Sequence, residues 1–376
     1  MAQCAAVRRW MSTAAVVGLW SAGSASAQIT PAAGYTPPDD TPSIRVGVTL
    51  FGDYTYTQSP QTTDADGNAV NASAFNVTRS YINVTGNVSH IVAFRITPDV
   101  VRESGLFNSA TAATVSNDSL VFRIKYAYLQ TNFDDWMTRG SWARLGIQQT
   151  PWLDFAEGVY RYRWQGTLFA EREGYFASAD AGASFHYNLP SNFGDVHVGV
   201  YNGENYNKVE VNDQKAVMIR ATVRPFASGA PILRGVRASV FYDGDNYIRD
   251  AGRTRFIAAA TFEYDYLNAS IEYLNTNDRT SAKVGTPDVH GNGLSIWATP
   301  KTKTGWQGLL RFDHLTTNTG IEGTRNRTIA GVAYWFPHQG TVSSALMVDY
   351  DGQTFDNVTP AQPSLKKIAV HALVNF

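Results

Sequence analysis

Basic side chains recur at every second position of several short segments whose other positions are apolar. In segment 120–128, for example, Arg123 and Lys125 alternate with apolar residues. The basic residues that share this pattern are Arg95, Arg123, Lys125, Arg144, Arg220, Arg224, Arg237, Arg255 and Arg311. Cations that face a water-filled passage raise the local anion concentration and replace part of an anion's hydration shell. The spacing therefore predicts a pore lining that favours anions.

Acidic residues on the same polar faces are fewer. They are Asp53, Asp99, Glu263, Glu272, Asp313 and Asp349. Arg311 is close enough to Asp313 in the sequence to pair with it, and other arginines could pair across adjacent strands. We expect a basic surplus to remain on the first eight strands. The alternative is a lumen whose charges are paired and which does not select by charge.

Residues that could perform hydrolysis are present but do not share a face. Asp313 and His314 are adjacent, so strand alternation places His314 on the apolar face and Asp313 on the polar one. A triad with Ser295 needs all three side chains together. We therefore predict no enzymatic activity and no catalytic residues.

Metal-ligand spacing is also missing. His186, His197 and His290 are scattered. Segment 64–68, Asp-Ala-Asp-Gly-Asn, resembles the start of a calcium loop but lacks the closing Glu. We predict a polar turn there, with a divalent-cation site as the alternative, and we predict no metal centre and no cofactor.

The elements that must position these side chains are short strands. From Ile44 onward, apolar and polar residues alternate with a period of two between Gly, Asn, Asp and Pro residues. We predict sixteen strands, at 44–57, 74–87, 90–101, 119–132, 141–149, 175–187, 194–202, 215–226, 235–244, 254–264, 266–275, 292–300, 305–315, 326–337, 341–351 and 365–376.

The connections between these strands alternate in length. Odd-numbered connections such as 58–73 and 150–174 are mostly long, whereas even-numbered ones such as 88–89 and 188–193 are mostly short. Transmembrane barrels combine short periplasmic turns with long extracellular loops. The fold class predicted is therefore all-β, a transmembrane antiparallel β-barrel with both chain ends on the periplasmic side.

Soluble sandwiches, jelly rolls and propellers also alternate apolar and polar residues, and they are the alternative fold. In those folds, long and short loops do not alternate along the chain. Aromatic residues also gather near strand ends, as expected for belts at membrane interfaces. The examples are 54–56, 126–128, 264–266 and 334–336. Both features favour the barrel.

Composition excludes several other classes. The 376 residues are 44% hydrophobic and only 17% charged, with 19 Tyr and 19 Phe, and one Cys excludes a disulfide scaffold. Beyond the first few dozen residues, no stretch approaches the roughly 18 apolar residues of a spanning helix. With a net charge of −1, the chain has no excess of basic residues that would indicate nucleic-acid binding.

The amino terminus has the pattern of an export signal. Arg8 and Arg9 precede a short apolar core at 11–22, and a small-x-small pattern ends at Ala27. We predict a signal peptide at 1–27, a Pro-rich periplasmic tether at 28–43 and an outer-membrane barrel at 44–376.

Two stretches resemble a known family. Segment 75–88, with its continuation at 94–99, resembles the opening hairpin of the phosphate-selective porin O and P family. Segments 125–129 and 146–151 extend the match, and the terminal Phe376 looks like the assembly signal of bacterial outer-membrane barrels. The resemblance covers roughly residues 44–190. It implies a trimeric, sixteen-stranded anion channel, although the family's long arginine ladder cannot be aligned here residue by residue.

The resemblance also implies that the loop after the fifth strand, residues 151–174, folds inward and narrows the channel. This loop carries charges of both signs with interleaved aromatic residues. The predicted constriction residues are Asp154, Glu157, Arg161, Tyr162, Arg163 and Arg172. Opposed charges at a constriction create a transverse field that orients polar solutes. The alternative is an ordinary solvated surface loop.

These observations predict a porin of the bacterial outer membrane. We expect passive diffusion of small hydrophilic solutes with a preference for anions, phosphate among them. The expected partners are these solutes, outer-membrane lipid and, by resemblance, two further copies in a homotrimer, with no nucleic acid. The alternatives are a general non-selective porin and a plugged barrel with a structural or surface-binding role.

Overall fold

The computed structural model describes residues 40–102, 106–108, 113–115, 119–210, 212–321, 323–338, 340 and 342–376. The predicted signal peptide and the tether up to residue 39 lie outside this range. Among the described residues, no helix is both long and apolar enough to cross a membrane.

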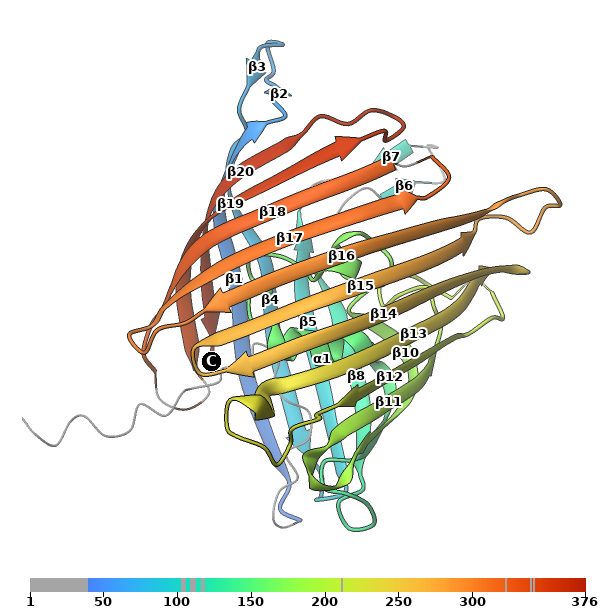
Figure 1. Cartoon of the computed structure of the whole chain (residues 1–376), viewed down its shortest axis with the longest axis vertical. Coiled ribbons are helices and arrows are strands. Elements are labelled where there is room, and N and C mark those ends of the chain that lie inside the picture. Colours follow the sequence, from blue (N-terminus) through green and yellow to red (C-terminus); the bar gives the residue numbers. More distant parts are fainter. Residues whose placement is uncertain are drawn as a thin grey trace, which may run out of the picture.

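The described chain forms a closed antiparallel barrel of sixteen strands (Figure 1). Each strand is hydrogen-bonded to its neighbours in chain order, and β20 pairs with β1 to close the sheet. The barrel strands are β1 (Ser43–Ser59), β4 (Ser73–Asn87), β5 (Val92–Arg102), β8 (Leu120–Asn132), β9 (Trp142–Gln149), β10 (Ala179–Asn188), β11 (Gly194–Tyr201), β12 (Ala216–Val223), β13 (Val236–Ile248), β14 (Ala251–Tyr264), β15 (Leu267–Arg279), β16 (Asp288–Pro300), β17 (Trp306–Asn318), β18 (Gly323–Trp335), β19 (Ser343–Asp356) and β20 (Leu365–Asn375). The predicted fold class and strand number are confirmed.

Alternation along each strand places apolar side chains outside and polar ones inside. On β8, Phe122 is 67% exposed whereas Lys125 is 2% exposed. On β20, Val370 and Val374 are exposed and His371 is buried. Such a surface suits a lipid environment, because hydrocarbon offers no partners to polar groups.

The two ends of the barrel differ. The end called here the short-turn end holds the connections β4–β5, β8–β9, β10–β11, β12–β13, β14–β15, β16–β17 and β18–β19, together with the 3-10 helices η1 (Pro190–Asn192) and η2 (Leu233–Gly235). The C terminus also lies there, where Phe376 exchanges backbone hydrogen bonds with Val48 (Figure 1). The opposite, long-loop end carries two small hairpins, β2 (Thr62–Thr63) with β3 (Ala69–Val70) and β6 (Leu106–Asn108) with β7 (Ala113–Val115).

Several strand boundaries differ from those predicted. The strand predicted at 175–187 begins at Ala179, because residues 175–176 belong to a loop inside the barrel. The strand predicted at 215–226 ends at Val223. The connection predicted at 245–253 is shorter, because β13 and β14 remain paired as far as Ile248 and Ala251.

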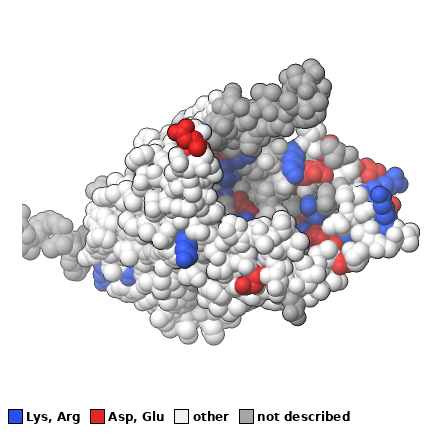
Figure 2. All heavy atoms as spheres, turned by 90° about the horizontal axis from the view of Figure 1, so that it is seen from above, with Lys and Arg blue, Asp and Glu red and all other residues white. Residues whose placement is uncertain are grey.

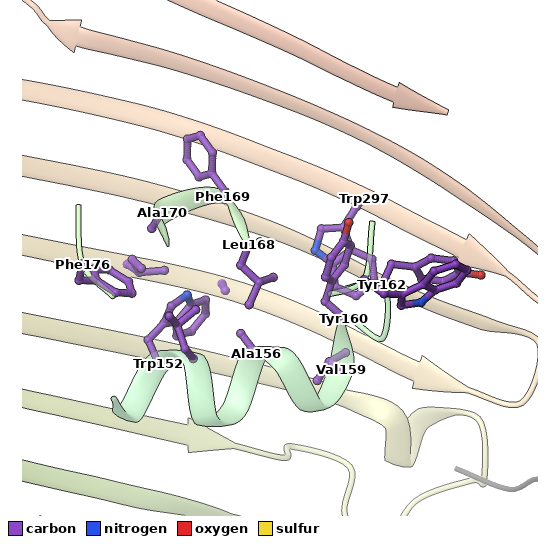
Figure 3. Packing of buried hydrophobic residues seen from close by; sticks show 14 of the residues in the cluster. Trp152, Ala156, Val159, Tyr160, Tyr162, Leu168, Phe169, Ala170, Phe176 and Trp297 are labelled. Carbon is purple, nitrogen blue, oxygen red and sulfur yellow. The ribbon is translucent and has the colours of Figure 1, made fainter. Parts of the chain in front are cut away.

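The connection between β9 and β10 folds inward and is called here the inserted loop. It contains α1 (Pro151–Val159) and α2 (Phe169–Arg172). Pro151 is the first residue of α1. The N–H at this position has no partner within a helix, so its absence in proline costs no hydrogen bond. Trp152, Tyr160, Leu168 and other apolar side chains of the loop pack on inward apolar residues of the barrel wall (Figure 3). The wall residues in this cluster include Phe241, Ile257, Leu274, Trp297, Leu315 and Ile329.

Candidate functional site

The first turn of the inserted loop is fastened to β9 and β12 by two of the predicted lining arginines. Arg220 donates from Nε to the Pro151 carbonyl at 2.9 Å, and its guanidinium lies 4.9 Å from the centre of the Phe155 ring. Arg144 Nη1 lies 3.8 Å from Asp154. Both arginines are buried. Both therefore contact the loop as well as facing the lumen.

Three charged side chains in the middle of the loop, Arg163, Glu157 and Glu171, form a buried ionic group, called here the clamp. Arg163 donates to Glu157 at 2.7 Å and to Glu171 at 2.9 Å, so it joins α1 to α2. Burial alone would lower the pKa of Arg163. The carboxylates of Glu171 and Glu157 have the larger effect and raise this pKa above its usual value. The clamp thus holds three charges in one fixed arrangement.

Two further loop residues contact the wall. The buried Tyr162 donates its hydroxyl hydrogen to Gln307 Oε1 at 3.1 Å and accepts from Trp335 Nε1 at 3.3 Å. Arg161 pairs with one oxygen of Glu263, whose other oxygen accepts from Arg237 at 3.0 Å. Tyr162 therefore points at β17 and β18, and Arg161 contributes to an ionic group on β13 and β14.

Arg172 lies in a basic part of the loop. Its Nη2 donates to Gln165 at 3.2 Å. Burial, together with the positive charges of Arg311 and Arg327, lowers the pKa of Arg172 to about 10. Gln165 in turn donates to Asp349 at 2.8 Å. This end of the loop therefore brings α2 next to the charged side chains of β17, β18 and β19.

A second group of charges lies on β4, β5 and β8 and is called here the basic wall. Arg79 Nη1 and Arg123 Nη2 each lie 3.2 Å from the same Oδ2 of Asp99. Arg95 donates to Asn83 at 2.8 Å and stacks on Tyr126 at 4.4 Å. Each arginine keeps N–H groups beyond those these contacts use.

Lys125 also belongs to the basic wall. Its Nζ donates to the Tyr81 hydroxyl at 3.1 Å and lies 5.0 Å from the centre of that ring. Glu157 and Arg163 of the clamp are among the charges that act on Lys125. The clamp and the basic wall therefore belong to one electrostatic site.

Sequence reasoning missed two members of this site. Arg79 escaped notice because a bulge between β1 and β4 interrupts the alternation, where Phe51 pairs with Arg79 but Gly52 with Val77. Tyr206 belongs to the connection between β11 and β12, and Arg123 lies 4.9 Å from its ring centre. No pattern in the sequence marks a loop residue that points into the barrel. Tyr206 is therefore seen only in the three-dimensional structure.

The remaining predicted lining residues lie elsewhere in the barrel. Arg255 donates to Asp278 at 2.7 Å and stacks on Tyr175 at 5.0 Å. Arg224 follows the end of β12 and donates to the Arg234 carbonyl in the short turn, so it does not lie on a strand as predicted. Arg311 pairs with Asp313 at 2.8 Å, as expected from their spacing.

The segment resembling a calcium loop forms a self-contained turn. Asp64 accepts hydrogen bonds from the backbone of Asp66 at 3.0 Å and of Asn68 at 2.9 Å. Hydrogen bonds from Asn68 lower the pKa of Asp64. Within the described ranges, no group of three His, Cys, Asp or Glu residues is arranged to hold a metal ion.

Viewed from above, the molecule is hollowed, and Lys, Arg, Asp and Glu side chains gather inside the hollow (Figure 2). The outer surface in the same view carries only a few separate charged groups. Charged side chains are thus concentrated in the hollow.

The sequence matches no family model and no curated protein. Solved structures match over most of the chain. An anion-selective porin from Comamonas acidovorans has a TM-score of 0.60 and 10% identity, and the match covers 89% of this chain and 100% of that one. The outer-membrane channel DcaP of Acinetobacter baumannii has a TM-score of 0.60 and 14% identity, covering 92% and 100%.

Salmonella typhi OmpF, solved in complex with daunomycin, has a TM-score of 0.58 and 11% identity, and the match covers 90% of this chain and 98% of that one. Identities this low carry information on the fold alone. The chain therefore shares the closed, sixteen-stranded barrel fold of these bacterial outer-membrane proteins.

Proposed function

We propose that this protein is an outer-membrane porin through which small hydrophilic solutes diffuse passively, with a preference for anions. The observation that carries this proposal is the basic wall facing the clamp of the inserted loop. We expect export through the signal peptide at 1–27, location in the outer membrane and assembly as a homotrimer. The first two expectations rest on the sequence pattern and the lipid-compatible surface, and the third on the resemblance.

The argument for anions is a local charge imbalance. Asp99 is shared by Arg79 and Arg123, so one negative charge faces two positive ones. Arg95 and Lys125 bind neutral amide and hydroxyl groups. The side chains of Arg79 and Arg123 remain 23% and 24% exposed, so an oxyanion that enters this region can accept hydrogen bonds from them, which replaces part of its hydration.

The clamp supplies the opposite side of the proposed constriction. Glu157 and Glu171 hold Arg163 between them, leaving one excess negative charge on this part of the loop. A field that runs from the basic wall toward the loop would orient polar solutes. The constriction residues remain a proposal, with Arg161 and Arg172 at its margins and Tyr162 as an anchor.

Phosphate is the specific anion proposed by the resemblance. Arg79, Arg95 and Asp99 all fall within the segments that carry it. One structural neighbour is described as anion-selective, which is consistent with anion preference in this chain. Phosphate is therefore the first solute to test as a blocker of chloride current.

A general porin is the second candidate, because many lumen charges are paired. Arg220 pairs with Asp195, and Arg327 forms a bidentate pair with Asp351 at 2.7 and 2.6 Å. If pairing dominates, the channel will conduct without distinguishing ions by charge. A plugged barrel would not conduct at all.

A charge-removal experiment tests the proposal. In a planar bilayer with a KCl gradient, we expect the double variant R79Q/R123Q to lose most of the anion selectivity, because the basic wall loses two cations while the Asp99 carboxylate remains. Arg139 is a matched control, since its side chain is 89% exposed on a short turn. If R79Q/R123Q and R139Q have the same reversal potential as the unaltered protein, the basic wall does not set selectivity.

A further inference from the structure

Two histidines lie beside Arg220, the residue that attaches the first turn of the inserted loop to the barrel wall. His186 on β10 is in register with His197 on β11, and His197 is in register with Arg220 on β12. Trp142 on β9 stacks on His186 at 5.0 Å and meets His197 edge-on at 4.9 Å. The four side chains form one continuous layer.

His197 is fully buried in this layer. Its exposed fraction is 0%, and neither ring nitrogen has a hydrogen-bond partner among the described residues. A neutral imidazole tolerates such a site, but a protonated one needs an acceptor or a counter-charge. The surroundings of His197 therefore decide what happens when it takes up a proton.

Two arginines and a second histidine face His197 from the neighbouring strands. Arg220 comes from β12, Arg144 from β9 and His186 from β10. Asp195, on β11 itself, is the nearby carboxylate of this group. Its Oδ2 already pairs with Arg220 and accepts from His186 Nε2 at 3.1 Å.

Arg220 links this layer to the loop. Its guanidinium holds the Pro151 carbonyl and the Phe155 ring at the first turn of α1. Arg144 also reaches the loop, where Asp154 partly balances its charge. A positive charge on His197 would repel both arginines and weaken both attachments.

We propose that His197 makes the anchor of the inserted loop sensitive to acid, so that protonation releases the first turn of α1 and narrows the channel. This inference rests on the proposed porin function. Because Arg220 attaches this turn to the barrel wall at β12, a released turn moves away from that wall, into the lumen. Conductance and the flux of uncharged solutes should therefore both fall at low pH.

His371 provides an internal contrast. It also touches the loop, with its ring 6.3 Å from that of Trp164. Its Nε2 lies 3.1 Å from Asp349, so a proton added there meets a carboxylate. Protonation of His371 is thus expected to strengthen that contact and not to release the loop.

The test measures single-channel conductance, and the flux of an uncharged sugar into proteoliposomes, from about pH 7.5 to about pH 4. This range extends well below the pKa of a free imidazole, because the buried site of His197 hinders protonation. We expect both to drop by about half or more in the unaltered protein. In H197F the aromatic contact with Trp142 is kept and the titration is removed, so the drop should disappear. In H290Q, which removes an exposed histidine on β16, and in H371Q, the drop should remain.

Arg220→Gln provides a second route in case H197F does not fold. This variant removes the charged link, so at neutral pH it should conduct as the acid form of the unaltered protein does and should respond little to acid. The sugar flux separates loop movement from a mere change of charge, because an uncharged solute is indifferent to added charge.

The inference is wrong if conductance and sugar flux do not change with pH, or if H197F and R220Q keep the full response. Absence of current at every pH would instead contradict the porin function itself. The two failures are therefore distinguishable in one experiment.

Discussion

At the scale of single residues, the clamp shows that a charged side chain inside the barrel can be fully paired with other side chains of the protein. The Arg163 guanidinium is only 7% exposed and is satisfied by Glu157 and Glu171. Removing one member of a buried ionic group leaves the others without compensation. The clamp is thus a sensitive point of the loop.

Replacing Arg163 with Gln should destabilise the folded protein by about 3–5 kcal/mol, because two buried carboxylates would then repel each other without a cation. Urea-induced unfolding of the reconstituted protein would measure the loss. The exposed R139Q should change the free energy of unfolding by less than about 0.5 kcal/mol. Equal unfolding midpoints for the two variants would show that Arg163 is not a clamp.

A second residue-scale feature lies outside the barrel wall, at the short-turn end. His90 Nδ1 lies 2.5 Å from Asp40 of the predicted tether, and Nε2 lies 2.8 Å from Asp135 of the next short turn. Hydrogen bonds that His90 donates to Asp40 and Asp135 raise the pKa of His90, and the bonds that Asp40 accepts from His90 lower the pKa of Asp40. The three residues fasten the tether to two turns.

The pH dependence of this contact follows from the directions of the two shifts. The stabilisation due to His90 is complete below its unfolded pKa, about 6.5, and is lost as the pH rises through the raised folded value. That due to Asp40 is complete above its unfolded pKa, about 3.9, and is lost as the pH falls through the lowered value. Histidine NMR titrations should give His90 a pKa above that of a free imidazole, and D40N or D135N should bring it down. An ordinary pKa in the unaltered protein would rule out the contact.

At the scale of elements, alternation was sufficient to predict the strands. Inward and outward faces followed directly on β20, which has an unbroken period of two. On β8 a register shift opposite Pro98 breaks the alternation, so that Lys125 and Tyr126 are both buried. The fold of the inserted loop was not predictable in the same way. Its aromatic residues fit inward apolar positions such as Ile257 and Leu274, which belong to strands remote in sequence.

Trp152 connects the inserted loop to the barrel wall. It is 1% exposed, and its ring centre lies 6.2 Å from that of Phe241. We expect W152A to lower the free energy of unfolding by about 3–5 kcal/mol through lost burial and the cavity left behind. Thermal unfolding in detergent would measure this, with the lipid-facing Leu145→Ala as control, since Leu145 is 65% exposed. Equal losses in both variants would mean that the loop contributes little to stability.

Close contact between strands depends on particular glycines. Gly146 has a φ of +126°, and a Cβ there would collide with the carbonyl oxygen of Ala127 on β8. G146A should therefore prevent normal pairing of β8 with β9. We expect reduced recovery of folded barrel in a refolding assay, whereas G158A in α1, where nothing lies within 4 Å and the φ is not positive, should refold in normal yield. Normal yield for G146A would contradict this role.

At the scale of the whole molecule, the barrel exposes many large apolar side chains on its outside, and charged side chains gather in its hollow (Figure 2). The sequence predicted this separation and the number of strands, because both depend on local periodicity. It did not predict which charges pair. Arg79 and Arg123 meet at Asp99 only because three neighbouring strands are brought into register, with a bulge that alternation does not reveal.

The net selectivity of the molecule depends on the sum of these pairings and of the unpaired cations of the basic wall. The most direct measurement is the reversal potential of the purified protein in a planar bilayer across a KCl gradient. We predict an anion-selective value, with chloride current reduced by added phosphate. A zero or cation-selective value would contradict the role of the basic wall, and absence of current would contradict the porin function.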